Sequence, residues 1–161
     1  MIISFEDFKT ENRIPGLHPI IGTFDELNCV KESEINMFIE KYEPLYLYDF
    51  YFDKDVVNEL EAYTELDVRT DTEKNVLIES FRQPIANYVA FWYFREQETL
   101  NTSIGGANPQ IGGAIKVSTI DRQVKLWNEM VRYTRSIYID LYTSCFFPQR
   151  DIFHLINSFN I

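Results

Sequence analysis

The sequence is poor in the residues that mark metal, redox or phosphate-binding proteins. Its 161 residues include two cysteines and two histidines, and Cys29 and Cys145 match no metal-binding or redox spacing. Both are typical of reduced thiols in a cytosolic product. Only 15 residues are Lys or Arg against 25 Asp or Glu, a net charge of −10. This balance disfavours a surface that binds phosphates.

Long apolar runs are missing as well. No stretch approaches the ~20 apolar residues that a membrane-spanning helix needs. The first nine residues lack the basic region and cleavage site of a signal peptide. We therefore expect a soluble protein that is not addressed to export and has no membrane partner. Aromatic residues, in contrast, are frequent, at 16%. The length predicts one domain, residues 1–161, with a single core.

The usual catalytic motifs are also absent. Gly105-Gly106 and Gly112-Gly113 lack the preceding strand and the following Lys-Ser/Thr of a phosphate-binding loop. Asp151 and His154 share one helical face, but no second carboxylate–histidine pair completes a di-metal site. We predict no catalytic residue, no cofactor and no metal. A hydrolase whose carboxylates converge only in the fold stays open as an alternative.

Hydrophobic periodicity predicts helices with proline boundaries in the first half. Residues 1–32 are expected to be irregular, because prolines recur there, although Phe5 and Phe8 suit a core. A helix is predicted from Ser33, with an interruption at Pro44 and helical segments beyond it.

The clearest helix of this half runs from Asp71 to about Leu100. Pro84 should either kink it or start a second helix. Residues 88–94 are aromatic or apolar on all sides, which predicts burial on more than one side. That burial could lie within the fold or against another subunit.

The second half predicts a projecting loop, a long helix and a tail. Residues 101–117 hold four of the six glycines. This segment predicts a projecting loop that docks on another surface. A helix then begins at Ser118 or Thr119, and residues 146–161 form a docking tail. The expected core stripe of that helix comprises Ile120, Val124, Trp127, Val131, Thr134, Tyr138 and Leu141. Its basic face comprises Arg122, Lys125, Arg132 and Arg135. The predicted fold class is all-α, a small bundle of four or five helices with a long loop between the last two main helices.

Charge is distributed unevenly along the chain. Residues 1–100 hold 21 acidic and 9 basic residues, a balance of −12, whereas residues 101–161 hold 4 acidic and 6 basic residues, a balance of +2. Such asymmetry suits two different surfaces, or simply an acidic solvated face. It also supports an alternative function, an acidic DNA mimic that inhibits a host nucleic-acid enzyme. Single-stranded nucleic acid is a poor match for the aromatic runs, because carboxylates flank the first of them.

A resemblance to a known family begins at Asn87 and ends at Tyr138. An aromatic helix ends in Phe91-Trp-Tyr-Phe-Arg95, a Thr/Ser/Gly/Asn-rich loop follows, and a helix carries Trp127-Asn-Glu-Met-Val131. This order resembles head–tail connector (neck adaptor) proteins of tailed bacteriophages, particularly small ones of crAss-like and related phages of Bacteroides-type hosts. It covers about a third of the chain.

The resemblance implies a structural protein of the virion neck that passes through the host cytoplasm during assembly. Twelve copies would form a ring under the portal protein, contact adjacent neck or tail proteins, and extend a channel through which double-stranded DNA passes without sequence-specific binding. Trp92 and Trp127 are expected in the bundle core. The expected subunit or portal contacts are Ile104, Gly105, Gly106, Asn108, Ile111, Ile115, Arg132, Arg135, Phe147, Phe153 and Phe159.

Overall fold

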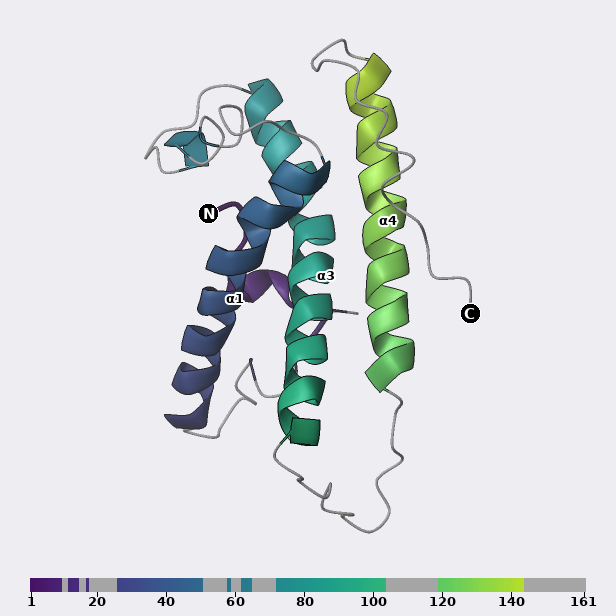
Figure 1. Cartoon of the computed structure of the whole chain (residues 1–161). Coiled ribbons are helices and arrows are strands. Elements are labelled where there is room, and N and C mark those ends of the chain that lie inside the picture. The colour runs from purple at the N-terminus through teal and green to yellow at the C-terminus, as the bar shows by residue number, and fades with distance from the viewer. Residues whose placement is uncertain are drawn as a thin grey trace.

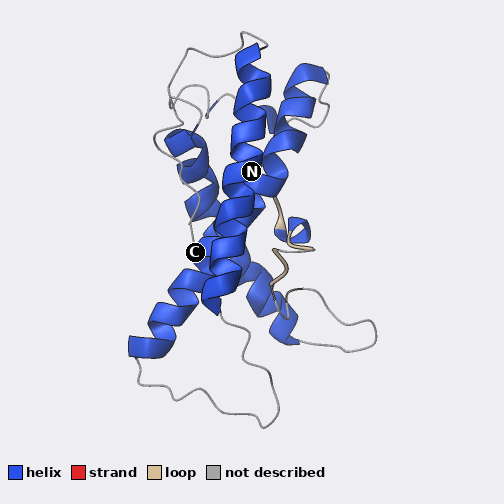
Figure 2. Ribbon diagram, turned by 90° about the vertical axis from the view of Figure 1, so that its right-hand side faces the viewer, coloured by secondary structure: helices blue, strands red, loops and turns tan. Residues whose placement is uncertain are grey.

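The described part of the chain is mainly helical and is dominated by three long helices, with one short 3-10 helix in the N-terminal segment. The structure, a computed structural model, describes residues 1–9, 12–14, 17, 26–50, 58, 62–64, 72–103 and 119–143. Within these ranges the elements are η1 (Phe5–Asp7), α1 (Glu26–Phe50), α3 (Thr72–Ser103) and α4 (Thr119–Thr143), with no strand. The predicted all-α fold class is thereby confirmed (Figure 2).

The three long helices lie side by side in a row, with α3 in the middle (Figure 1). They run up, down and up, so α1 and α4 point in the same direction. α3 packs extensively against both neighbours, whereas α1 and α4 touch each other little. A helix in this position must be apolar on two opposite sides. Every residue from Pro84 to Phe91 is indeed buried, which places the burial predicted for the aromatic run within the fold.

Both internal prolines lie within continuous helices. α1 begins at Glu26 and runs through Pro44 to Phe50, so the predicted start at Ser33 and the predicted interruption were wrong. Residues on both sides of Pro44 are buried, and this packing outweighs the hydrogen bond that proline removes. α3 likewise continues through Pro84, which does not split it. The first turns of α3 are inclined to the rest of the helix, as a proline kink produces (Figure 1).

The N-terminal segment packs across α1 and α3 and supplies part of the core. Its η1 turn is fixed by a capping box, in which Ser4 accepts from the backbone of Glu6 and Asp7 accepts from the backbone of Ser4. The segment was predicted to be irregular and to lie partly on the core. Both predictions are confirmed for its described residues up to residue 17. Its buried apolar residues are Ile2, Ile3, Phe8, Ile14 and Leu17.

A buried carboxylate fixes this segment to α1. Glu43 is only 1% exposed, and its two oxygens accept hydrogen bonds from the backbone N–H groups of Ile2 at 2.7 Å and Ile3 at 3.0 Å. Burial of a carboxylate is costly unless such charge-assisted bonds replace its water. The arrangement therefore selects one register of the segment, since a shift by one residue would remove both bonds. A second tie, at the surface, joins Asp7 to Arg82 of α3 at 3.3 Å.

We predict that Glu43→Gln destabilises the fold by about 2 kcal/mol. The amide retains one acceptor oxygen but turns an N–H donor toward a backbone N–H that then lacks its partner. Urea unfolding followed by circular dichroism measures the change. Glu6→Gln is the matched control, because Glu6 is an exposed glutamate of the same N-terminal segment. It should shift stability by less than about 0.5 kcal/mol, and equal effects of the two variants would refute the role assigned to Glu43.

Candidate assembly surface

The buried side of α4 faces α3 but is rotated from the stripe that periodicity predicted. Val131 and Thr134 of that stripe are buried, whereas Ile120 is 60% exposed. α4 has a single main neighbour, so its buried side is narrow, and Ile120 lies outside it. Among the residues of α4 whose burial is described, the buried ones are Leu126, Met130, Val131, Thr134 and Ile137.

Aromatic side chains form the seams between the helices. Trp92 of α3 stacks on Tyr42 of α1 with ring centroids 5.2 Å apart and planes 3° from parallel. Phe91 of α3 meets Trp127 of α4 at 5.0 Å. Both tryptophans were predicted to belong to the core. Each is partly buried and packs against the core cluster, so both lie at the margin of the core. The seams hold the row together and leave its two outer edges for other contacts.

A polar lock closes the α1–α3 seam at the surface. Glu96 of α3 accepts hydrogen bonds from the Lys41 ammonium at 2.8 Å and from the Tyr42 hydroxyl. These bonds lower the pKa of Glu96, with Lys41 as the main cause, and the bond to Glu96 raises the pKa of Lys41. Burial, and then the bond to Glu96, raises the pKa of Tyr42. All three shifts maintain an ion pair with a neutral phenol at neutral pH.

We predict that Glu96→Gln reduces the loss of stability in acid. The folded-state pKa of Glu96 lies below its ordinary value of 4.5, so its contribution is present above that pH and disappears as the pH falls through the lower folded-state pKa. Both side chains are well exposed, so the contribution is under about 1 kcal/mol. The free energy of unfolding at pH 7 and pH 3, in both proteins, measures it. An unchanged pH dependence would contradict this assignment.

The basic residues of α4 divide into an inner and an outer set. Arg122 turns toward the bundle, with its guanidinium 4.3 Å from the ring centre of Phe94 and a bond to the Arg13 carbonyl, and burial lowers its pKa. Lys125 and Arg132 project outward, and the Arg132 side chain is 65% exposed beside Glu129 of the same helix. Arg135 is half-buried. Of the two arginines predicted at the interface, Arg132 is therefore the more accessible.

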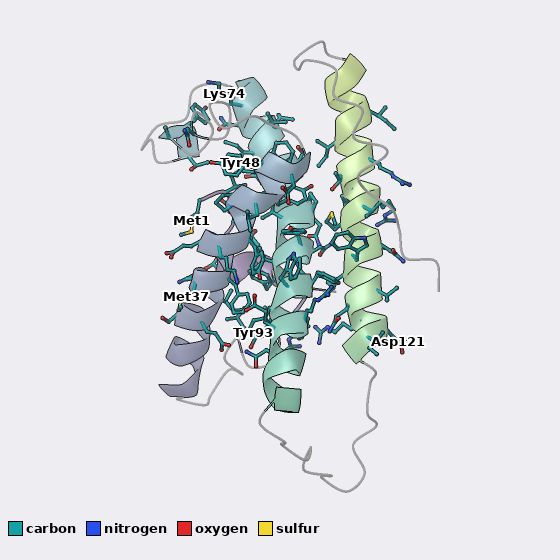
Figure 3. All side chains as sticks on the ribbon, viewed as in Figure 1. Met1, Met37, Tyr48, Lys74, Tyr93 and Asp121 are labelled. Atoms are coloured by element: carbon teal, nitrogen blue, oxygen red, sulfur yellow. The ribbon has the colours of Figure 1, made fainter. Side chains whose placement is uncertain are left out.

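The opposite edge of the row is the outer face of α1, which the sequence reasoning did not single out. Met37 is 67% exposed there, on the side of α1 away from α3 (Figure 3). Glu40 and Leu45 are exposed on the same helix. The helical period could have found this face, because Met37 and Glu40 fall off the buried stripe that includes Ile35 and Ile39.

The remaining predicted contact residues lie outside the described residues. They belong to the segment 104–118 and to the segment that follows residue 143. The predicted loop was wrong for residues 101–103, which belong to α3, and the rest of that loop and the docking tail stay predictions. These residues are Ile104, Gly105, Gly106, Asn108, Ile111, Ile115, Phe147, Phe153 and Phe159.

The described residues contain no cluster of three or more His, Cys, Asp or Glu side chains that could hold a metal ion. Among the described helices, none combines the length and the apolar character needed to cross a bilayer. Comparison with models of protein families, with curated proteins and with solved structures gives no significant match. The functional argument therefore rests on the chain's own geometry and on the resemblance in residues 87–138.

Proposed function

We propose that this chain is a non-catalytic structural subunit that assembles with copies of itself into a ring in the neck of a tailed phage. The observation that carries the proposal is the single row of helices with two different outer edges, α1 and α4 (Figure 1). Contact between unlike edges is heterologous, and it closes into a ring when the rotation between copies divides a full turn. The connector resemblance supplies the position under the portal and the head–tail joint.

The charge balance supports the same proposal. A channel that DNA enters and leaves should not grip phosphates, and excess negative charge weakens such adhesion by repulsion. The chain carries −10 overall. In this proposal the portal and adjacent neck or tail proteins are the further partners, and no cofactor is required.

The alternative of an acidic DNA mimic gains less support from the described carboxylates. A mimic needs carboxylates in a regular row on one face, free to meet a basic partner. Glu43 instead holds backbone N–H groups inside the fold, Glu96 pairs with Lys41, and Glu34 accepts from Gln97 of α3 at 2.6 Å. Four of the ten carboxylates of α1 and α3, these three and Glu79 with Arg82, thus serve contacts within the chain.

We predict closed rings of the full chain at high protein concentration. Native mass spectrometry across a dilution series, with negative-stain electron microscopy of the largest species, measures the copy number and shape. A single closed species, most tellingly of twelve subunits, is the expected result. A 1:1 complex with a basic nuclease or polymerase, without self-association and without binding to a phage portal ring, would contradict the proposal and favour the DNA mimic.

A further inference from the structure

We infer that the outer face of α4 in one copy docks, in parallel, on the outer face of α1 in the next copy, with Arg132 beside Glu40. This inference rests on the proposed function, because it identifies the contact that would build the ring. Its occupant is a second copy of this chain, and charge complementarity between the two edges is the first argument for it.

The two edges carry opposite net charge. Among the residues of α1 whose burial is described, the exposed charged ones are Glu40, Lys41 and Asp49, and Lys41 pairs with Glu96 of α3, so the edge is acidic. The corresponding residues of α4 are Asp121, Lys125 and Arg132, a balance of +1. Like edges would therefore repel or gain nothing, whereas α4 against α1 brings opposite charges together. Complementary unlike edges favour a head-to-tail contact over a two-fold dimer.

The direction of the helices makes the contact parallel. α1 and α4 run the same way in one subunit (Figure 1). Rotation about an axis along the helices keeps that direction in every copy. A closed ring also allows no axial shift between neighbours, since a shift would generate an open spiral. The α4 helix of one copy therefore meets the α1 helix of the next at the same height.

One hydrogen bond sets the register of that contact. The hydroxyls of Tyr46 in α1 and Thr134 in α4 lie 2.7 Å apart, 88 positions apart in the chain. Tyr46 and Thr134 therefore lie at about the same height, and near them a residue of α1 lies at about the height of the residue 88 positions later in α4. Glu40 is level with Asn128, between Lys125 and Arg132, both of which are exposed.

The same register pairs further groups along the contact. Met37 is level with Lys125, whose aliphatic stem can cover the exposed thioether. Both edges thus combine exposed charge with exposed apolar surface, which suits a contact of moderate strength.

A charge exchange between the two edges tests the inference. Arg132→Glu and Glu40→Arg should each raise the concentration for half-assembly about tenfold, because each places like charges together. The double variant should restore assembly to within about threefold of the unchanged protein. Sedimentation velocity over a dilution series measures all three. Assembly of the unchanged protein should also weaken with added salt.

Lys9→Glu is the matched control, since it changes the charge by the same −2 in the exposed N-terminal segment outside both edges. It should assemble normally, and Arg132→Gln serves if Arg132→Glu fails to fold beside Glu129. Normal assembly of the single variants, or failure of the double variant to recover, would overturn the α4–α1 contact and leave the ring proposal standing. A monomeric unchanged protein that binds no phage portal ring would overturn both.

Discussion

The position of α3 between α1 and α4 is the constraint on which the rest of the structure depends. A central helix loses its solvent-facing side, and residues 84–91 are accordingly all buried, with apolar or aromatic side chains except for Asn87, which accepts a hydrogen bond from Gln83. The aromatic contacts of Tyr42 with Trp92 and of Phe91 with Trp127 then fix its two neighbours. Because α3 occupies the middle, α1 and α4 become the outer edges. The proposed ring follows from that separation.

The polar contacts within this arrangement contribute very different amounts to its stability. Glu43 is buried and holds two backbone N–H groups, so its loss leaves donors without water or partner. The ion pair of Lys41 with Glu96 is exposed, where solvent screens the attraction. The buried carboxylate therefore decides where the N-terminal segment lies, whereas the exposed pair adds little. Exposed charges at the outer edges therefore add little to stability and can instead affect which partner binds.

Patterns within the sequence predicted which helices exist better than they predicted where each helix begins and ends. The aromatic run of residues 88–94 gave the central helix, and periodicity gave the existence of α4. Pro44 led to the wrong prediction of an interruption, because the hydrogen bond that a proline removes is evident from the sequence. The packing of Tyr46 and Leu47 beyond it is not evident there. The stripe of α4 was rotated for a related reason, since Ile120 lies outside the buried side of that helix. Nothing in the sequence distinguishes Glu43 from the other carboxylates, because only the fold brings Ile2 and Ile3 to it.

The sequence by itself determined the helical class, the helix that is apolar or aromatic on more than one side over residues 88–94, and the excess of negative charge. These depend on residue type and on spacing within one element, which are local properties. The tertiary structure alone decided that α1 and α4 lie on opposite sides, that Arg132 projects while Arg122 turns inward, and that Tyr46 is level with Thr134. Each of these depends on which neighbour covers which face of a helix. Periodicity shows that a face is covered, but the covering residues lie far away in the chain.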